Sequence, residues 1–397
     1  MNDKYDLVCL SHLRWAFVFQ RPQHLLSRCA RDRRVFFVEE PIFSETPNRL
    51  ELTVTEEGVH VVVPHLDQQT PSDEVDAVQA ELLRIFLAER GVEHFVLWYY
   101  TPMALPIGEG LKPAAIVYDC MDQLSAFKGA PASLLDRERE LMRKADVVFT
   151  GGHSLFEEKR SSHWNIHPFP SSVDVPHFAQ ALAPQAPPKD QAEIPGPRLG
   201  FFGVIDERMD LELLAGVASA RPNWQLVMLG PVVKIDEADL PRLSNIHYLG
   251  AKKYNELPRY IAGWDVAILP FARNDSTKFI SPTKTPEYLA AGRPVVSTSI
   301  ADVVSPYLAL GLVRIADDVQ GFVAACEDAL QDTTDEHRNK AKSFLSKMSW
   351  DKTWHEMEAL VQTALREHDR VKASRTPRAP RAGETSEESQ PNTAGGQ

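Results

Sequence analysis

The sequence predicts an α/β protein built from two doubly wound domains that face a central cleft. Short apolar runs alternate with longer segments of helical spacing, which is the pattern of a parallel sheet covered by helices. The pattern stops at a segment rich in Ala, Pro and Gln and then starts again. The chain has 397 residues, 43% of them apolar, and this length exceeds what one hydrophobic core usually supports.

The first half, residues 1–180, is expected to form the N-terminal domain. Five short apolar runs predict strands at 5–11, 33–40, 94–100, 114–120 and 145–151. Apolar residues at helical spacing predict three helices between them, at 23–30, 76–90 and 134–145.

Residues 181–197 read as a linker, because this stretch has little periodicity. The C-terminal domain is expected at 198–345, with strands at 199–205, 224–230, 246–250, 266–271, 293–298 and 312–316. Its helices are predicted at 209–220, 254–264, 285–292 and 319–331. A last amphipathic helix is expected within 346–369, and residues 370–397 are polar and rich in Pro, Gly and Ser, which predicts disorder.

The composition excludes some classes of protein. A formal net charge of −12 argues against a general nucleic-acid binder, because phosphate neutralisation needs a basic face. The four cysteines lack zinc-ligand spacing and indicate reduced thiols in a cytoplasmic protein. Four arginines predict a solvated helix end, with contact to a membrane surface as the alternative: Arg28, Arg31, Arg33 and Arg34.

The stretch "SPTKTPEYLAAGRPVV", residues 281–296, places a helix start directly after hydroxyl groups and a cation. Free backbone N–H groups at a helix start attract phosphate, and Lys284 would add a full positive charge there. Glu287 on the first turn could accept hydrogen bonds from sugar hydroxyls. Together these groups suit a nucleotide diphosphate. The alternative is that Glu287 only complements the helix dipole and Lys284 is a solvated surface charge.

Several segments together resemble a known family. "NIHYLGAKKYNELPRYIAGWDVAILPF" and "SPTKTPEYLAAGRPVVSTSI" are similar to the nucleotide-binding half of GT-B glycosyltransferases of the family 1/family 4 type. "FPSSVDVPHF" and "LGFFGVIDERMDLELL" resemble the segments that precede it. "QRPQHL" and "YDCMD" resemble bacterial members assigned to teichuronic acid or other cell-surface polysaccharide assembly.

This resemblance implies a GT-B fold of two Rossmann-like domains and a nucleotide diphosphate sugar, most often a UDP-sugar, as donor. It implies that Glu287 binds the ribose. The other donor-binding residues it implies are Gly203, Arg208, Ser281, Thr283 and Lys284. It further implies retention of configuration and no bound metal or other cofactor. The first glutamate of the family's paired motif is replaced here by Phe279.

The N-terminal half is expected to hold the acceptor, a glycan or a lipid-linked saccharide. Polar residues after the first strand suit sugar binding: Arg21, Gln23 and His24. Candidate catalytic residues follow the fourth and fifth strands: Asp119, Asp122 and His153. A carboxylate there can orient an acceptor hydroxyl or act as a general base. The alternatives are that Asp119 caps a turn, Arg21 is a surface charge and His153 is structural.

The sequence therefore predicts a cytoplasmic glycosyltransferase that acts in cell-surface polysaccharide synthesis and can meet a lipid-linked acceptor at the inner membrane surface. Two alternatives remain at this point. One is a nucleotide-sugar epimerase on the same fold. The other is a non-catalytic glycan-binding or scaffold subunit, because fold alone does not decide function.

Overall fold

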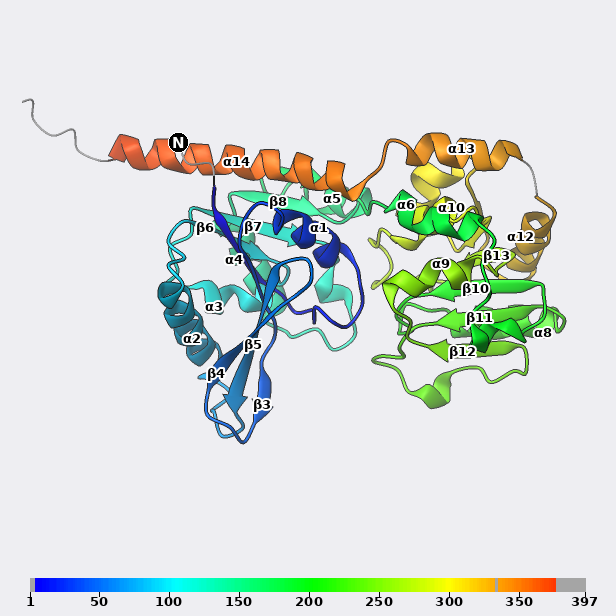
Figure 1. Cartoon of the computed structure of the whole chain (residues 1–397), viewed down its shortest axis with the longest axis horizontal. Helices are drawn as coiled ribbons and strands as arrows, with labels where there is room; N and C mark the ends of the chain where they lie inside the picture. The colour runs from blue at the N-terminus through cyan, green and yellow to red at the C-terminus, as the bar shows by residue number, and fades with distance from the viewer. Residues whose placement is uncertain (1–3, 333–334, 376–397) are drawn as a thin grey trace, which may run out of the picture.

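The computed structural model of the chain describes residues 4–332 and 335–375. It consists of two halves side by side, each built on its own sheet (Figure 1). Of the predicted tail, residues 370–375 continue the last helix, whereas 376–397 lie outside the described residues.

The N-terminal sheet has nine strands within the described residues, in the order β3-β5-β2-β1-β6-β7-β8-β9, with β4 antiparallel to β5. The strands are Asp6–Leu10 (β1), Val35–Val38 (β2), Ile42–Ser44 (β3), Arg49–Val54 (β4), Val59–Asp67 (β5), Phe95–Tyr99 (β6), Ala115–Cys120 (β7), Val147–Thr150 (β8) and Ile166–Pro168 (β9). The five predicted strands are all present. They are buried along nearly their whole length, as parallel strands covered on both faces must be.

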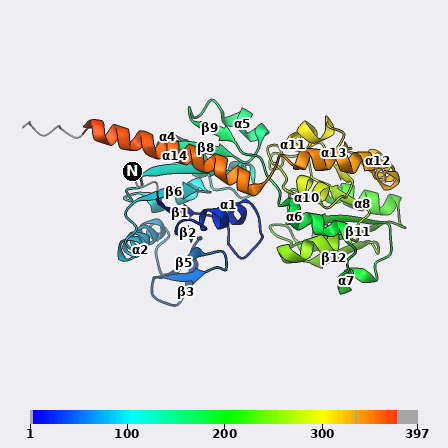
Figure 2. The same ribbon diagram turned by 45° about the horizontal axis from the view of Figure 1, so that its top comes forward.

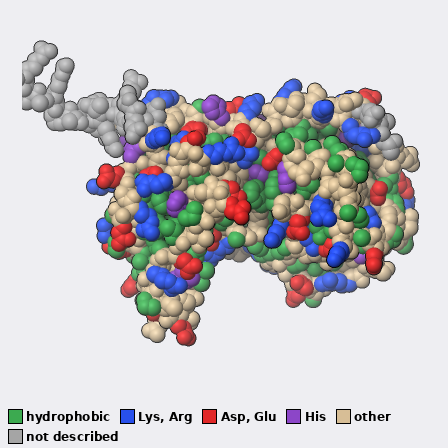
Figure 3. Space-filling model, in the orientation of Figure 1, with side chains coloured by type: hydrophobic (Ala, Val, Ile, Leu, Met, Phe, Trp, Pro, Cys, Tyr) green, Lys and Arg blue, Asp and Glu red, His purple; other side chains and the backbone are tan. Residues whose placement is uncertain are grey.

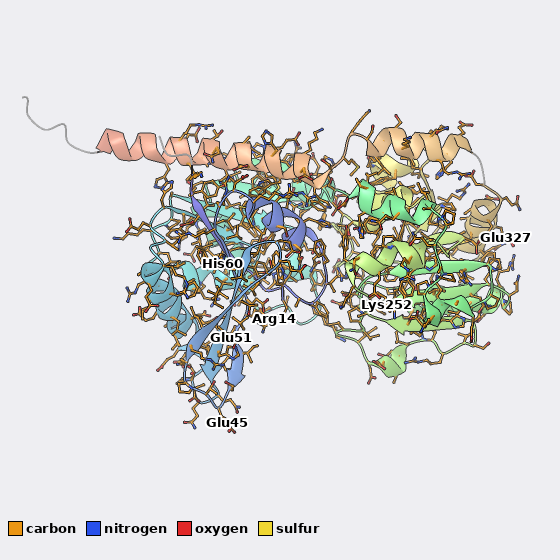
Figure 4. The ribbon with its side chains drawn as sticks, in the orientation of Figure 1. Arg14, Glu45, Glu51, His60, Lys252 and Glu327 are labelled. Carbon is orange, nitrogen blue, oxygen red and sulfur yellow. The ribbon has the colours of Figure 1, made fainter. Side chains whose placement is uncertain are left out.

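The ribbon formed by strands β3 to β5 was not predicted. Strands β3 and β4 are largely exposed and lack a buried apolar run, whereas β5 is buried or half-buried along its whole length and its apolar run was missed. This ribbon protrudes from the N-terminal half, with Glu45 and Glu51 labelled on it in Figure 4. The helices of this half are Arg21–Cys29 (α1), Val75–Glu89 (α2), Leu105–Gly108 (α3), Leu134–Lys144 (α4) and His153–Lys159 (α5).

The C-terminal sheet is parallel throughout, in the order β12-β11-β10-β13-β14-β15. Its strands are Arg198–Phe202 (β10), Gln225–Leu229 (β11), Ile246–Gly250 (β12), Val266–Leu269 (β13), Val295–Ser297 (β14) and Val313–Ile315 (β15). The helices are Val175–Phe178 (α6), Lys189–Ala192 (α7), Leu211–Ala220 (α8), Leu257–Ile261 (α9), Lys284–Ala290 (α10), Ala301–Val303 (α11), Val319–Gln331 (α12) and Asp335–Leu345 (α13). The strand order reverses at β10 and β13, where doubly wound sheets bind ligands.

The segment expected to be a linker contains the short helix α7 and packs on the C-terminal half. Gln191 is fully buried. Its side chain accepts a hydrogen bond from Trp264 Nε1 at 3.0 Å and donates to the Tyr260 carbonyl at 2.9 Å. A glutamine as the anchor explains why no apolar periodicity marked this helix.

The last helix, Trp350–Arg375 (α14), leaves the C-terminal half and lies across the N-terminal half (Figures 1 and 2). Its apolar stripe joins the core of that half through Trp350, Trp354, Met357, Val361, Ala364 and Leu365. Asp351 pairs with Arg28 at 3.0 Å and Arg31 at 2.6 Å, and Arg33 pairs with Glu358. The expected solvated helix end is corrected for Arg28 and Arg33, whose side chains are 12% and 10% exposed and pair with α14. Arg31 and Arg34 are exposed, as expected.

Trp350 anchors the start of α14. It is fully buried and stacks on His24 with ring centroids 4.5 Å apart. We expect Trp350→Ala to lower the free energy of unfolding by about 3–5 kcal/mol, because a buried tryptophan is replaced by a cavity. Trp164, which is 78% exposed, is the control. Trp164→Ala should change the free energy of unfolding by less than about 0.5 kcal/mol. Equal midpoints for both variants in urea unfolding would contradict this role of Trp350.

Candidate active site

A cavity of about 510 Å³ lies between the two halves, at the carboxyl ends of their strands. The N-terminal half contributes the loop 15–20 after β1, and the C-terminal half contributes the loops after β10, β11 and β12 and the start of α10. In Figure 4, Arg14 marks the N-terminal side of this region and Lys252 the C-terminal side. A smaller cavity of about 100 Å³ adjoins it, since both are lined by Gln20, Val204, Arg208, Thr283 and Lys284.

Two glycines allow the backbone to come close beneath the larger cavity. Gly203 and Gly230, which follow β10 and β11, have φ of +140° and +142°, values that side chains disfavour. A Cβ on Gly203 would lie 2.2 Å from Lys284 Cε, and one on Gly230 would lie 1.8 Å from the Gly203 carbonyl oxygen. The missing side chains therefore make room for the Lys284 side chain against the end of β10.

The start of α10 brings Lys284 and Glu287 into this cavity. Glu287 is 4% exposed, and its Oε2 is buried without a hydrogen-bond partner. Burial raises the pKa of Glu287 to about 8, and the nearby Lys284 opposes this shift. Burial, followed by the charge of Arg208, lowers the pKa of Lys284 to about 8. A buried polar atom without a partner is unusual, and a ligand hydroxyl would satisfy it.

Arg208 lines both cavities and is held there by Asp206. Its guanidinium binds the Asp206 carboxylate through Nε at 2.9 Å and Nη2 at 2.7 Å. The ring of Phe127, from the N-terminal half, lies 5.5 Å from Arg208 and 5.0 Å from Lys234. Asp206 and Phe127 were not singled out from the sequence, although the spacing D-x-R was a readable signal for a carboxylate beside Arg208.

Asp119 and Arg21 form a buried ion pair at the smaller cavity, which Arg21 lines. Asp119 is fully buried and Arg21 is 4% exposed, with Arg21 Nη2 2.9 Å from Asp119 Oδ1. Arg21 also donates to the Phe169 carbonyl at 2.7 Å. Asp119 was expected to be a catalytic candidate and Arg21 an acceptor contact. The structure corrects this for Asp119, because no substrate atom can reach its fully buried carboxylate. Arg21 lines the smaller cavity, although Asp119 and the Phe169 carbonyl hold its guanidinium, so its acceptor contact stays a prediction.

Asp122 lies in the smaller cavity, where the two halves meet. Burial raises the pKa of its carboxyl, whereas the charges of Arg208 and Arg21 lower it. Within residues 4–332 and 335–375 no hydrogen bond to this carboxylate is formed. Asp122 is therefore the candidate carboxylate that a substrate can reach, close to the Arg208 and Lys284 cations.

The remaining predicted residues differ in position. Gln23 lines the larger cavity and holds the loop 15–20, since it donates to the Trp15 carbonyl at 2.8 Å and accepts from Gln20 N at 3.0 Å. His24 is 3% exposed and stacks on Trp350, and burial lowers its pKa well below the usual value. The acceptor contact expected of His24 is thus corrected to core packing. His153 is exposed outside both cavities, so a catalytic role is not supported for it.

Ser281 and Thr283, the hydroxyl residues ahead of α10, both line the smaller cavity. Thr283 also lines the larger one. Of the predicted donor-binding residues, the structure therefore gathers Gly203, Arg208, Ser281, Thr283, Lys284 and Glu287 around two adjoining cavities.

Two doubly wound domains that face one cavity, with cations and a buried acid at a helix start, are the arrangement expected of the GT-B fold. Comparison with known proteins agrees. Residues 196–332 match the family model "Glycosyl transferases group 1". The chain is 24% identical over 338 residues to TuaH of Bacillus subtilis strain 168, which is assigned to teichuronic acid biosynthesis as a glycosyltransferase, and the match covers 78% of each protein.

Solved structures share the fold. Sucrose-phosphate synthase from Thermosynechococcus elongatus superposes with a TM-score of 0.69 at 14% identity, covering 92% of this chain and 100% of the other. HepE from Anabaena, solved with UDP and glucose, gives a TM-score of 0.63 at 14% identity, covering 91% and 100%. The chain therefore has the GT-B fold, and the matches to the family model and to TuaH identify it as a glycosyltransferase. None of its helices within the described ranges, 4–332 and 335–375, is long and apolar enough to cross a membrane.

Proposed function

We propose that this glycosyltransferase moves a sugar from a UDP-sugar to a hydroxyl of a glycan or lipid-linked saccharide in cell-surface polysaccharide synthesis, with retention of configuration. The observation that carries this proposal is the pair Lys284 and Glu287 on the first turn of α10, which faces the larger cavity. The ammonium suits the diphosphate and the carboxyl suits the ribose diol.

The donor binds in the C-terminal half. Gly203 and Gly230 line the larger cavity, and the missing side chain of Gly203 lets Lys284 lie against the end of β10, where it can meet the diphosphate. Ser281 and Thr283 offer hydroxyl groups to it. Arg208 and Lys284 offset the charge that develops on the leaving diphosphate, so the chain's own residues supply this stabilisation. The structure of HepE with bound UDP supports uracil as the base.

The acceptor binds against the N-terminal half. The loop 15–20 presents aromatic side chains to the larger cavity, among them Phe17, which is 49% exposed. Sugar rings stack on such side chains. Asp122 is placed to orient the attacking hydroxyl or to accept its proton. The similarity to TuaH supports a cell-surface polysaccharide as the product.

The site of action that fits this acceptor is the cytoplasmic face of the membrane. A lipid-linked saccharide would bring the enzyme to the inner surface without an anchor of its own. Acidic and basic side chains are interspersed over both halves of the face in Figure 3, so this face offers no continuous basic patch for nucleic acid.

Calorimetric titration with UDP, GDP and ADP tests the donor. We expect UDP to bind, and Glu287→Ala to weaken it about tenfold or more, because the hydrogen bonds of the ribose to a buried carboxyl are lost. Glu212, an exposed glutamate on the first turn of α8, is the matched control, and Glu212→Ala should bind UDP as the wild type does. Absence of binding for all three nucleotides would contradict the proposal.

A further inference from the structure

Asp302 on α11 joins the two halves through hydrogen bonds to backbone. Its Oδ2 accepts from the backbone N–H of His153 at 2.9 Å, and its Oδ1 accepts from that of Ser154 at 2.9 Å. Both donors lie at the start of α5, in the N-terminal half, whereas α11 belongs to the C-terminal half. Figure 2 shows α5 and α11 next to each other at the boundary between the halves. Asp302 is 7% exposed, so this contact is shielded from water.

Gly152 allows the close approach at this boundary. A Cβ on Gly152 would lie 2.0 Å from Asp302 Oδ2 and 2.8 Å from the Cβ of Ser281. Beside it, Ser171 Oγ of the N-terminal half donates to the Ser281 carbonyl at 2.8 Å. Contact between the halves therefore accounts for glycine at this position.

The contact borders the smaller cavity. Gly151, next to Gly152, lines that cavity from the N-terminal half, and Ser281 lines it from the C-terminal half. Phe279, the residue in place of the family's first glutamate, packs against the hydrophobic core of the N-terminal half. The hydrogen bonds of Asp302 and the packing of Phe279 both connect the halves at the edge of the cavity that contains Asp122 and Lys284.

We propose that Asp302 is a positioning residue that holds the halves in the arrangement in which Asp122 and Lys284 share one cavity. A carboxylate suits this role because its two oxygens accept from two adjacent backbone donors, and hydrogen bonds to a charged acceptor are the stronger ones. Asparagine offers a single acceptor oxygen and no charge. A kinetic test of this proposal rests on the proposed function, whereas a measurement of how the two halves are arranged does not.

The test compares Asp302→Ala and Asp302→Asn with the wild type. We expect Asp302→Ala to increase the radius of gyration measured by small-angle X-ray scattering, because the halves separate. UDP affinity should stay within about twofold, since the nucleotide contacts belong to the C-terminal half. The kcat for consumption of UDP-glucose should fall about tenfold, the cost of losing hydrogen bonds to a charged group. The radius of gyration and kcat of Asp302→Asn should lie between those of the wild type and those of Asp302→Ala.

Asp318 provides the matched control. Its carboxylate accepts from the Gly321 N–H at 2.8 Å and caps α12 within the C-terminal half, so Asp318→Ala removes a similar bond that does not cross between halves. It should leave the radius of gyration and kcat unchanged. Gly152→Ala keeps Asp302 but places a methyl group at the boundary, and it should reproduce the effect of Asp302→Ala.

Unchanged scattering and unchanged kcat in Asp302→Ala would overturn the proposal. So would a loss of UDP affinity equal to the loss of kcat, because it would indicate general damage and not loss of positioning. If the wild type consumes no nucleotide sugar, the proposed function fails, whereas the scattering comparison still decides the role of Asp302.

Discussion

Replacing Lys284 with methionine is expected to weaken UDP binding about 100-fold, the cost of removing one partner of a shielded charge pair. Lys284 lines both cavities and lies against Gly203, so its ammonium faces the space in which a diphosphate would lie. Methionine preserves most of the side-chain volume and removes the charge. Isothermal titration with UDP measures the loss directly.

The same residue makes UDP binding depend on pH. Burial lowers the pKa of Lys284 to about 8 in the free protein, and the protonated form is the one that attracts the diphosphate. Affinity should therefore be full below pH 8 and fall as the pH rises above it, by up to about tenfold per pH unit. Ionisation of Glu287, whose pKa is raised to about 8, adds a negative charge in the same range and acts in the same direction.

Two variants separate this effect from general damage. Lys278 is an exposed lysine in the same loop, and Lys278→Met should bind UDP like the wild type. Lys284→Arg keeps its charge at every accessible pH, so its affinity should fall less steeply than that of the wild type between pH 7 and 9.5, and the fall that remains reports the ionisation of Glu287. A wild-type affinity that is constant over that range would contradict the assignment of Lys284 to the diphosphate.

The buried strands and the long helices could be predicted from the sequence because their apolar spacing is a local property. The five strands of the N-terminal core and the six of the C-terminal sheet are examples. The exposed strands β3 and β4 could not be predicted in this way, because they contain no buried apolar run. The apolar run of β5 was present in the sequence and was missed. The packing of α14 on the N-terminal half was equally hidden, since an amphipathic stripe does not say which domain it covers.

The same distinction between local patterns and long-range contacts applies to the residues of the candidate site. Lys284 and Glu287 lie within four consecutive residues at the start of α10. Both could therefore be selected as candidates from the local sequence. The role of Asp302 depends on donors about 150 residues away in the chain, at His153 and Ser154, and such a contact leaves no local pattern. The ion pair of Arg21 with Asp119 spans 98 residues, which is why both residues looked accessible in the sequence.

Asp119 and Asp122 show how burial separates two carboxylates that are three residues apart. Asp119 ends strand β7 and points into the core, where Arg21 neutralises it. Asp122 follows the strand and reaches the smaller cavity with Arg208 and Lys284. Removing the Asp119 charge leaves the Arg21 charge buried without a partner, so Asp119→Asn is expected to lower the free energy of unfolding by about 3–5 kcal/mol.

Asp122→Asn is expected to lower the rate of sugar transfer about 100-fold or more, the contribution of a well-placed general base. UDP affinity and the melting temperature should change little, because the amide has nearly the same shape and Asp122 pairs with no buried cation as Asp119 does. Steady-state kinetics with an identified donor and acceptor, combined with UDP titration, measures both effects. Asp136, an exposed residue on α4, provides the control, and Asp136→Asn should transfer at the wild-type rate. Equal losses of transfer and UDP affinity in Asp122→Asn would remove Asp122 from the acceptor side, since a residue that acts on the acceptor hydroxyl has no reason to weaken the nucleotide.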